Sequence, residues 1–201
     1  MNNIFQKTIT NEEIALLPLK AFEGNITLID SIEKFQAIYP ELRKESILGF
    51  DTETKPTFKK GESNLNKVSL LQLSTKDHAY LFRLNFTGLP KELAKILADR
   101  NIIKIGVAVR EDIRGLQKLT PFIPESFIDL KDYVRYFGIE NSGLKKLAAI
   151  ILNIKISKSQ QLSNWENPEL SEPQQKYAAT DAWACFEIYN TLRNSFNFDH
   201  D

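Results

Sequence analysis

The chain has 201 residues, of which 42% are hydrophobic and 26% are charged. This composition suits a folded domain with a buried core and excludes an intrinsically disordered protein. Lys plus Arg and Asp plus Glu each number 26, so the formal net charge is zero. A protein held on nucleic acid by bulk positive charge is therefore disfavoured. The single cysteine, Cys185, excludes a disulfide framework and a cysteine-rich zinc site.

The N-terminus has no positively charged segment followed by an apolar stretch, so the sequence predicts no secretory signal. The longest purely apolar run in the C-terminal half, residues 147–152, is too short to span a bilayer. We therefore expect a cytoplasmic protein with no membrane partner. We also expect an N-terminal extension, residues 1–25, that packs on a single domain, residues 26–201. The oligomeric state is left open.

Hydrophobic periodicity and capping signals predict the elements in chain order. The expected strands are residues 26–29, 47–52, 68–74, 78–82, 101–107 and 127–130. The expected helices are residues 11–17, 31–39, 89–97, 111–119, 131–137, 144–152 and 173–193. A polar, irregular segment is expected over residues 153–170.

Residues 75–77 form a short link that suits a hairpin between two of these strands, and later strands alternate with helices. This order predicts an α/β fold with a mixed sheet of about five strands, one of them antiparallel, flanked by helices. In such sheets the functional site lies beyond the carboxyl ends of the parallel strands.

Two carboxylates, Asp51 and Glu53, lie at the end of the predicted strand 47–52. Because strand side chains alternate, both point to the same side. Like charges placed so close raise each other's pKa unless a cation intervenes, and hard cations such as Mg²⁺ prefer carboxylate oxygen ligands. The alternative is a solvated strand end, where each carboxylate caps a turn or pairs with a lysine.

A second acidic position follows the predicted strand 101–107, at the start of the next helix. Asp112 is the candidate here, and the neighbouring Glu111 is its local rival. The alternative is a helix N-terminus that uses acidic residues to offset its dipole.

The last helix carries a more specific pattern. Tyr177 and Asp181 are four residues apart and share one helix face, which continues through apolar residues and must face the core. A carboxylate in line with an apolar stripe is costly unless it is paired or ligated. The alternative is a buried aspartate held by hydrogen bonds beside an ordinary core aromatic.

Taken together, these five residues resemble the DEDD superfamily of 3′–5′ exonucleases, which have an RNase H-like fold. The match is to the DEDDy subgroup, whose last motif is Tyr-x-x-x-Asp, and it is closest to the Werner-syndrome-protein-like exonuclease domain, with RNase D as a neighbour. The stretches that carry the resemblance are GFDTET at 49–54, VSLLQLS at 68–74, IGVAVREDIRGL at 105–116, GLKKLAAIIL at 143–152 and KSQQLSNWENPELSEPQQKYAATDA at 158–182. The chain departs from the family at Lys55-Pro56, where members often carry Trp or Phe.

The resemblance implies a site for two divalent ions, Mg²⁺ or Mn²⁺, about 3.5–4 Å apart. It implies that Asp51 bridges the ions, that Glu53 and Asp181 complete the first and that Asp112 holds the second. Tyr177 would orient the attacking water. The chain's two histidines, His78 and His200, lie away from these motifs, so the histidine version of the family does not apply.

Substrate contacts are expected on both sides of the cleft. A lysine-rich segment over residues 55–67 contains Lys59 and Phe58, and the aromatic ring has the character of a base-stacking group in a single-strand channel. The alternative is a surface loop with solvated lysines. The remaining candidates are Thr52, Leu70, Gln72, Lys158 and Trp165. For Leu70 and Gln72 ordinary core positions are the favoured alternative, and for Trp165 it is a packing anchor.

The resemblance therefore implies a metal-dependent exonuclease that removes nucleoside 5′-monophosphates from DNA 3′ ends. The nearest alternative is the same chemistry on RNA, as in RNase D. DNA is favoured because the chain has no room for the helical domains that follow the catalytic domain in RNase D-like enzymes. A further alternative is an inactive nucleic-acid-binding domain of the same fold. No G-x-x-x-x-G-K-[ST] loop occurs, so no fused helicase is expected.

Overall fold

The computed structural model describes residues 5–56 and 67–196, with the side chain of Phe196 left out. Its core is a six-stranded sheet in the order β1-β4-β3-β2-β5-β6. The strands are β1 (Asn25–Ile29), β2 (Ile47–Thr54), β3 (Val68–Ser74), β4 (His78–Arg83), β5 (Ile103–Gly106) and β6 (Phe127–Asp129). Strand β3 runs antiparallel to both of its neighbours, and the other pairs are parallel. The predicted mixed sheet is confirmed, with six strands where about five were expected.

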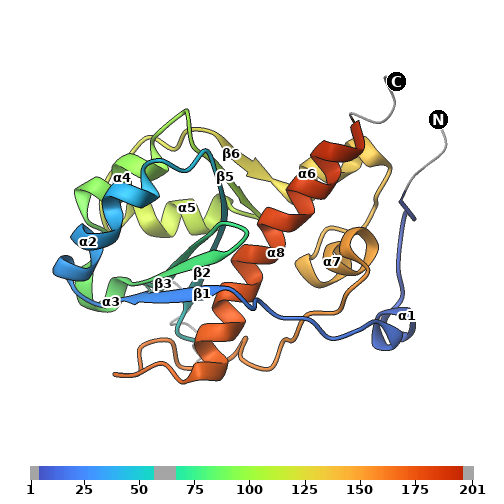
Figure 1. Cartoon of the computed structure of the whole chain (residues 1–201), viewed down its shortest axis with the longest axis horizontal. Coiled ribbons are helices and arrows are strands. Elements are labelled where there is room, and N and C mark those ends of the chain that lie inside the picture. The colour runs from blue at the N-terminus through green and yellow to red at the C-terminus, as the bar shows by residue number, and fades with distance from the viewer. Residues whose placement is uncertain (1–4, 57–66, 197–201) are drawn as a thin grey trace, which may run out of the picture.

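Helices cover both faces of the sheet (Figure 1). The helical elements are α1 (Asn11–Leu16), α2 (Ile32–Leu42), α3 (Leu84–Thr87), α4 (Lys91–Leu97), α5 (Arg110–Gln117), α6 (Leu130–Tyr133), the 3-10 helix η1 (Val134–Phe137), α7 (Leu144–Leu152) and α8 (Glu172–Phe196). Apolar residues of α2, α4 and α5 form one core with one face of the sheet, whereas α7 and α8 pack on the opposite face. Within the described residues, no helix is long and apolar enough to cross a membrane.

Most predicted boundaries agree with the structure to within two residues, and the differences have local causes. Strand β5 begins at Ile103 because Asn101 is held in a turn, where its backbone N–H donates to Asp99 at 2.8 Å. Helix α2 continues past Pro40 to Leu42, whose side chain is fully buried. Burial of that leucine offsets the backbone hydrogen bond that the proline cannot make. Helix α3 was not predicted.

The N-terminal segment lies against helix α7. Ile9 and Ile14 form a small apolar cluster with Ala149, and the Ile9 N–H donates to Asn141 Oδ1 at 2.9 Å. Lys155 joins the same region, because its Nζ donates to the Ala15 carbonyl at 2.7 Å. Residues before β1 are therefore in contact with the helix that forms one wall of the cavity described below.

Candidate active site

Strand β2 places two carboxylates on the α8 side of the sheet. In the antiparallel ladder Asp51 pairs with Gln72 and Glu53 pairs with Leu70, so both acidic side chains share one face. The parallel neighbour β5 pairs with β2 only as far as Gly49. Asp51 and Glu53 therefore project beyond the carboxyl end of the adjacent parallel strand, as expected from the sequence.

Helix α8 brings the third carboxylate. A Cβ added at Gly49 of β2 would lie 1.9 Å from the backbone oxygen of Ala182, so the helix backbone packs directly on the strand. This close approach requires glycine at position 49. Asp181 precedes Ala182 and is thereby held above the end of β2, although its side chain is only 8% exposed.

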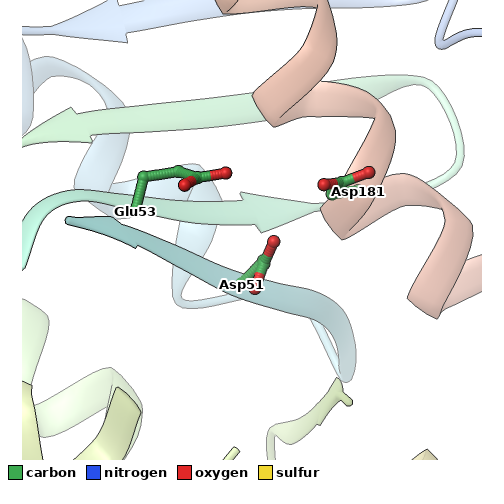
Figure 2. Close-up of side chains that lie close together, drawn as sticks. All are labelled: Asp51, Glu53 and Asp181. Atoms are coloured by element: carbon green, nitrogen blue, oxygen red, sulfur yellow. The ribbon is translucent and has the colours of Figure 1, made fainter. Parts of the chain in front are cut away.

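The side chains of Asp51, Glu53 and Asp181 form one cluster. Each offers a carboxylate oxygen, and these three oxygens lie within 4.8 Å of one another. Figure 2 shows Asp51 and Glu53 projecting from β2 toward Asp181 on α8, with all three carboxylates facing a common space. The fold thus brings together three of the five residues that the sequence singled out.

The protein stabilises the negative charges of this cluster poorly. Burial, and then the charges of Asp181 and Asp112, raise the pKa of Asp51 well above its usual range. Burial and the neighbouring carboxylates raise the pKa of Glu53 to about 9. Burial also raises the pKa of Asp181 to about 7, against the opposing effects of the Tyr177 hydrogen bond and Lys158. Without a cation, protons must occupy part of the cluster at neutral pH.

Three converging carboxylates fit the coordination preferences of a hard divalent cation, which binds oxygen ligands and offsets their mutual repulsion. The raised pKa values of the cluster indicate a site built for more positive charge than the described side chains supply. Asp51, Glu53 and Asp181 are therefore suited to hold a divalent metal ion.

Asp112 lies beside this cluster but outside the group of three. Thr52 Oγ1 donates to Asp112 Oδ1 at 2.5 Å, and burial raises the pKa of Asp112 to about 6. Its rival Glu111 is exposed and pairs with Arg114 at 2.6 Å. The geometry thus favours Asp112 over Glu111. Thr52 lines the cavity described below, so its expected contact with substrate stays a prediction.

Tyr177 lies one helical turn before Asp181. Its hydroxyl donates a hydrogen bond to the Asp181 carboxylate, and burial together with the nearby carboxylates raises the pKa of Tyr177 above its ordinary value. The phenol therefore stays protonated and acts as a donor rather than a base. Its ring packs against Trp165, with centroids 6.0 Å apart. Trp165 is fully buried, which agrees with a packing anchor and leaves no surface for base stacking.

A cavity of about 490 Å³ lies over the cluster. The lining includes Asp51, Glu53, Asp181 and Tyr177, together with Lys145, Lys146 and Lys158. Asn11, from the N-terminal segment, also lines it. Among these groups the sequence pointed to Lys158 but missed Lys145, Lys146 and Asn11. A second cavity of about 580 Å³, lined in part by Phe22 and Trp183, includes no residue of the acidic cluster in its lining.

Leu70 and Gln72 are fully buried in β3 and do not line this cavity. In this structure they have no exposed side-chain surface to offer a nucleotide, so the favoured alternative of core positions agrees with the geometry. The other two proposed substrate contacts, Phe58 and Lys59, lie outside the described residues.

A model of the 3′–5′ exonuclease family matches residues 26–197, which is most of the chain. The chain belongs to the 3′–5′ exonuclease family. The resemblance to DEDD-type exonucleases that the motifs indicated is therefore confirmed, and with it the class of enzyme, a phosphodiester hydrolase acting on nucleic acid.

Individual relatives agree with the family assignment. The chain is 37% identical over 166 residues to a putative 3′–5′ exonuclease of Acanthamoeba polyphaga mimivirus, a match that covers 75% of this chain and 40% of the relative. It is 30% identical over 199 residues to the mouse bifunctional 3′–5′ exonuclease/ATP-dependent helicase WRN, a match that covers 94% of this chain and 14% of the relative. It is 31% identical over 152 residues to ribonuclease D of Haemophilus influenzae, a match that covers 75% of this chain and 37% of the relative. This exonuclease domain thus spans less than half the length of each of these curated relatives.

Solved structures show the same fold. The Nibbler EXO domain of Aedes aegypti superimposes with a TM-score of 0.80 at 28% identity, covering 90% of this chain and 94% of that one. Escherichia coli RNase D superimposes with a TM-score of 0.76 at 22% identity, covering 87% and 46% respectively. The second likeness concerns the fold alone, and both agree with the predicted fold class.

Proposed function

We propose that this exonuclease domain removes nucleoside 5′-monophosphates from the 3′ ends of DNA, using two divalent metal ions, Mg²⁺ or Mn²⁺. The observation that carries the proposal is the partly buried cluster of Asp51, Glu53 and Asp181, whose charges lack sufficient compensation within the described residues. The family assignment supplies the direction of cleavage. RNA is the second candidate substrate, because a ribonuclease D is among the relatives.

In this proposal Asp51, Glu53 and Asp181 hold the metal ions, with Asp112 contributing to the second. When bound, the ions would polarise the scissile phosphate, promote ionisation of the attacking water and stabilise the leaving oxygen. Tyr177, which is kept protonated, orients the attacking water through its hydroxyl. Lys145, Lys146 and Lys158, which line the same cavity, bind the phosphate backbone.

The first test is a time course on a 5′-labelled DNA duplex with a recessed 3′ end, in Mg²⁺, Mn²⁺ or EDTA, beside the same sequence as single-stranded RNA. We expect a DNA ladder that shortens one nucleotide at a time and disappears with EDTA. Cleavage of RNA alone would transfer the proposal to the second candidate. Intact DNA and RNA with both metals would contradict a hydrolytic role.

Replacing Tyr177 with Phe should slow turnover by roughly 10–100-fold while leaving metal affinity within about twofold. The phenyl ring preserves the packing against Trp165, and only the hydroxyl is lost. Single-turnover cleavage and Mn²⁺ titration of the melting temperature separate the two effects. Full activity in the variant would assign Tyr177 to packing alone.

The lysines that line the cavity lead to a separate prediction about substrate binding. The double variant Lys145→Gln/Lys146→Gln should raise KM and reduce the slope of log KM against log salt by about 1.4, because each of two phosphate contacts in a single strand contributes roughly 0.7. The matched control is Lys91→Gln/Lys95→Gln on α4, across the sheet, where both lysines are exposed. Equal salt slopes in the two double variants would refute the assignment.

A further inference from the structure

The turn between β5 and α5 contains a residue in an unfavourable backbone conformation. Ala108 has a φ of 56°, in the left-handed region where an L-residue places its Cβ too close to the following carbonyl. The turn is also tightly packed, because a Cβ at Gly106 would lie 2.7 Å from the Phe50 carbonyl oxygen. An alanine stays in such a conformation only when neighbouring groups hold it there.

Asp129 supplies that support. Its Oδ1 accepts the backbone N–H of Ala108 at 2.9 Å and that of Lys131 at 3.0 Å. Asp129 is the last residue of β6 and pairs with Gly106 on β5. The parallel register therefore sets this carboxylate beside the turn, and one oxygen fixes both the turn and the start of α6.

The turn determines where helix α5 begins. The N-cap residue of α5, Val109, makes no side-chain capping bond, so the first turn of the helix lacks the usual fixing contact. Asp112 lies in that first turn, four residues after Ala108, and its carboxylate is held from the other side by Thr52. A change in the Ala108 dihedral angles would move the start of α5 and carry Asp112 away from Thr52 and from the acidic cluster.

We propose that Asp129 is a positioning residue for the metal site, acting through the left-handed turn at Ala108 to hold Asp112 beside Asp51. The inference rests on the proposed function, since it assigns Asp112 to the second metal ion. Asp129 itself touches neither metal nor substrate in this proposal.

The test compares Asp129→Ala, Asp129→Asn and the double variant Asp129→Ala/Ala108→Gly, with the exposed Asp132→Asn as a control. Two Mn²⁺ titrations are made for each protein. The first, without nucleic acid, gives the Mn²⁺ concentration at which half of the rise in melting temperature is reached. The second gives the Mn²⁺ concentration at which the cleavage rate is half-maximal. Circular dichroism confirms that each variant is folded.

We expect Asp129→Ala to need about tenfold more Mn²⁺, within the range seen when groups that orient metal ligands are lost. Asp129→Asn should stay within about twofold, because its amide oxygen can accept the same two N–H groups. Glycine adopts the left-handed conformation without strain, so Ala108→Gly should recover part of the loss in the double variant. If Asp129 acted only by capping α6, glycine at position 108 would not recover the loss.

An Asp129→Ala protein that matches wild type would overturn the inference. A double variant as weak as Asp129→Ala would also overturn it and assign the effect to α6. Failure of the proposed function would look different, because the wild-type protein would then show neither cleavage nor a Mn²⁺-dependent rise in melting temperature.

Discussion

Replacing Asp51 with Asn is expected to lower the cleavage rate by about 10³-fold or more while leaving the protein folded. Asp51 offers a carboxylate oxygen within 4.8 Å of those of Glu53 and Asp181, and in the proposed mechanism it would help to hold the metal ions. Loss of several kcal/mol of transition-state stabilisation corresponds to a rate loss of that order. The measurement is single-turnover cleavage of labelled DNA in saturating Mn²⁺.

The same substitution should raise the melting temperature of the metal-free protein by roughly 2–8 °C at pH 8. Burial and the charges of Asp181 and Asp112 oppose ionisation of Asp51, so a neutral amide of similar size relieves that repulsion. Asp132→Asn, at an exposed position on α6, should leave both rate and melting temperature unchanged. A variant that turned over at the wild-type rate would refute the mechanism.

The stability of the metal-free protein should fall as pH rises from about 5 to about 8. The pKa of Glu53 is about 9 and that of Asp181 about 7 in the folded protein, whereas both are near 4 in an unfolded chain. Between these limits the folded state binds more protons than the unfolded state, so the free energy of unfolding decreases with pH. At about 1.4 kcal/mol per pH unit per proton, Glu53 would contribute a loss of roughly 4 kcal/mol over these three pH units and Asp181 roughly 3 kcal/mol up to its pKa, so we expect a total loss of several kcal/mol.

Thermal unfolding in EDTA across this pH range checks the slope, and the expected fall in melting temperature is about 10 °C or more. Mn²⁺ at about 100 times its dissociation constant should restore about 2.7 kcal/mol at pH 8. Glu53→Gln should flatten the profile, and Glu12→Gln, at an exposed residue of α1, should not. A flat wild-type profile would show that the cluster ionises without penalty.

The sequence was sufficient to predict the sheet and the central carboxylates because the relevant signals are local. Alternation placed Asp51 and Glu53 on one face of β2, and a spacing of four placed Tyr177 and Asp181 on one face of α8. Consecutive apolar residues identified the strands, and β3 is buried at every position. These patterns depend on neighbours within one element, so they can be read without tertiary information.

The features that the sequence could not predict depend on contacts between distant elements. Lys104 lies in a strand and is fully buried, and its Nζ donates to the Asp99 carbonyl at 2.7 Å. The left-handed conformation of Ala108 has no propensity signal, since alanine rarely adopts it. The position of Lys145 and Lys146 in the cavity lining could be recognised only from the placement of α7 beside the cluster. In each case the conformation or position depends on another residue that is brought near by the fold.

The direct contact between Gly49 of β2 and the Ala182 backbone of α8 also determines which substitutions this protein tolerates. Any side chain at position 49 would push the helix outward and separate Asp181 from Asp51, although neither carboxylate is altered. A mutational library scored separately for folding and for nuclease activity should therefore return different results at this position. Variants with a small side chain at position 49 should fold, because the sheet can accommodate a shifted helix. They should lose nuclease activity, because the shift would separate the three carboxylates.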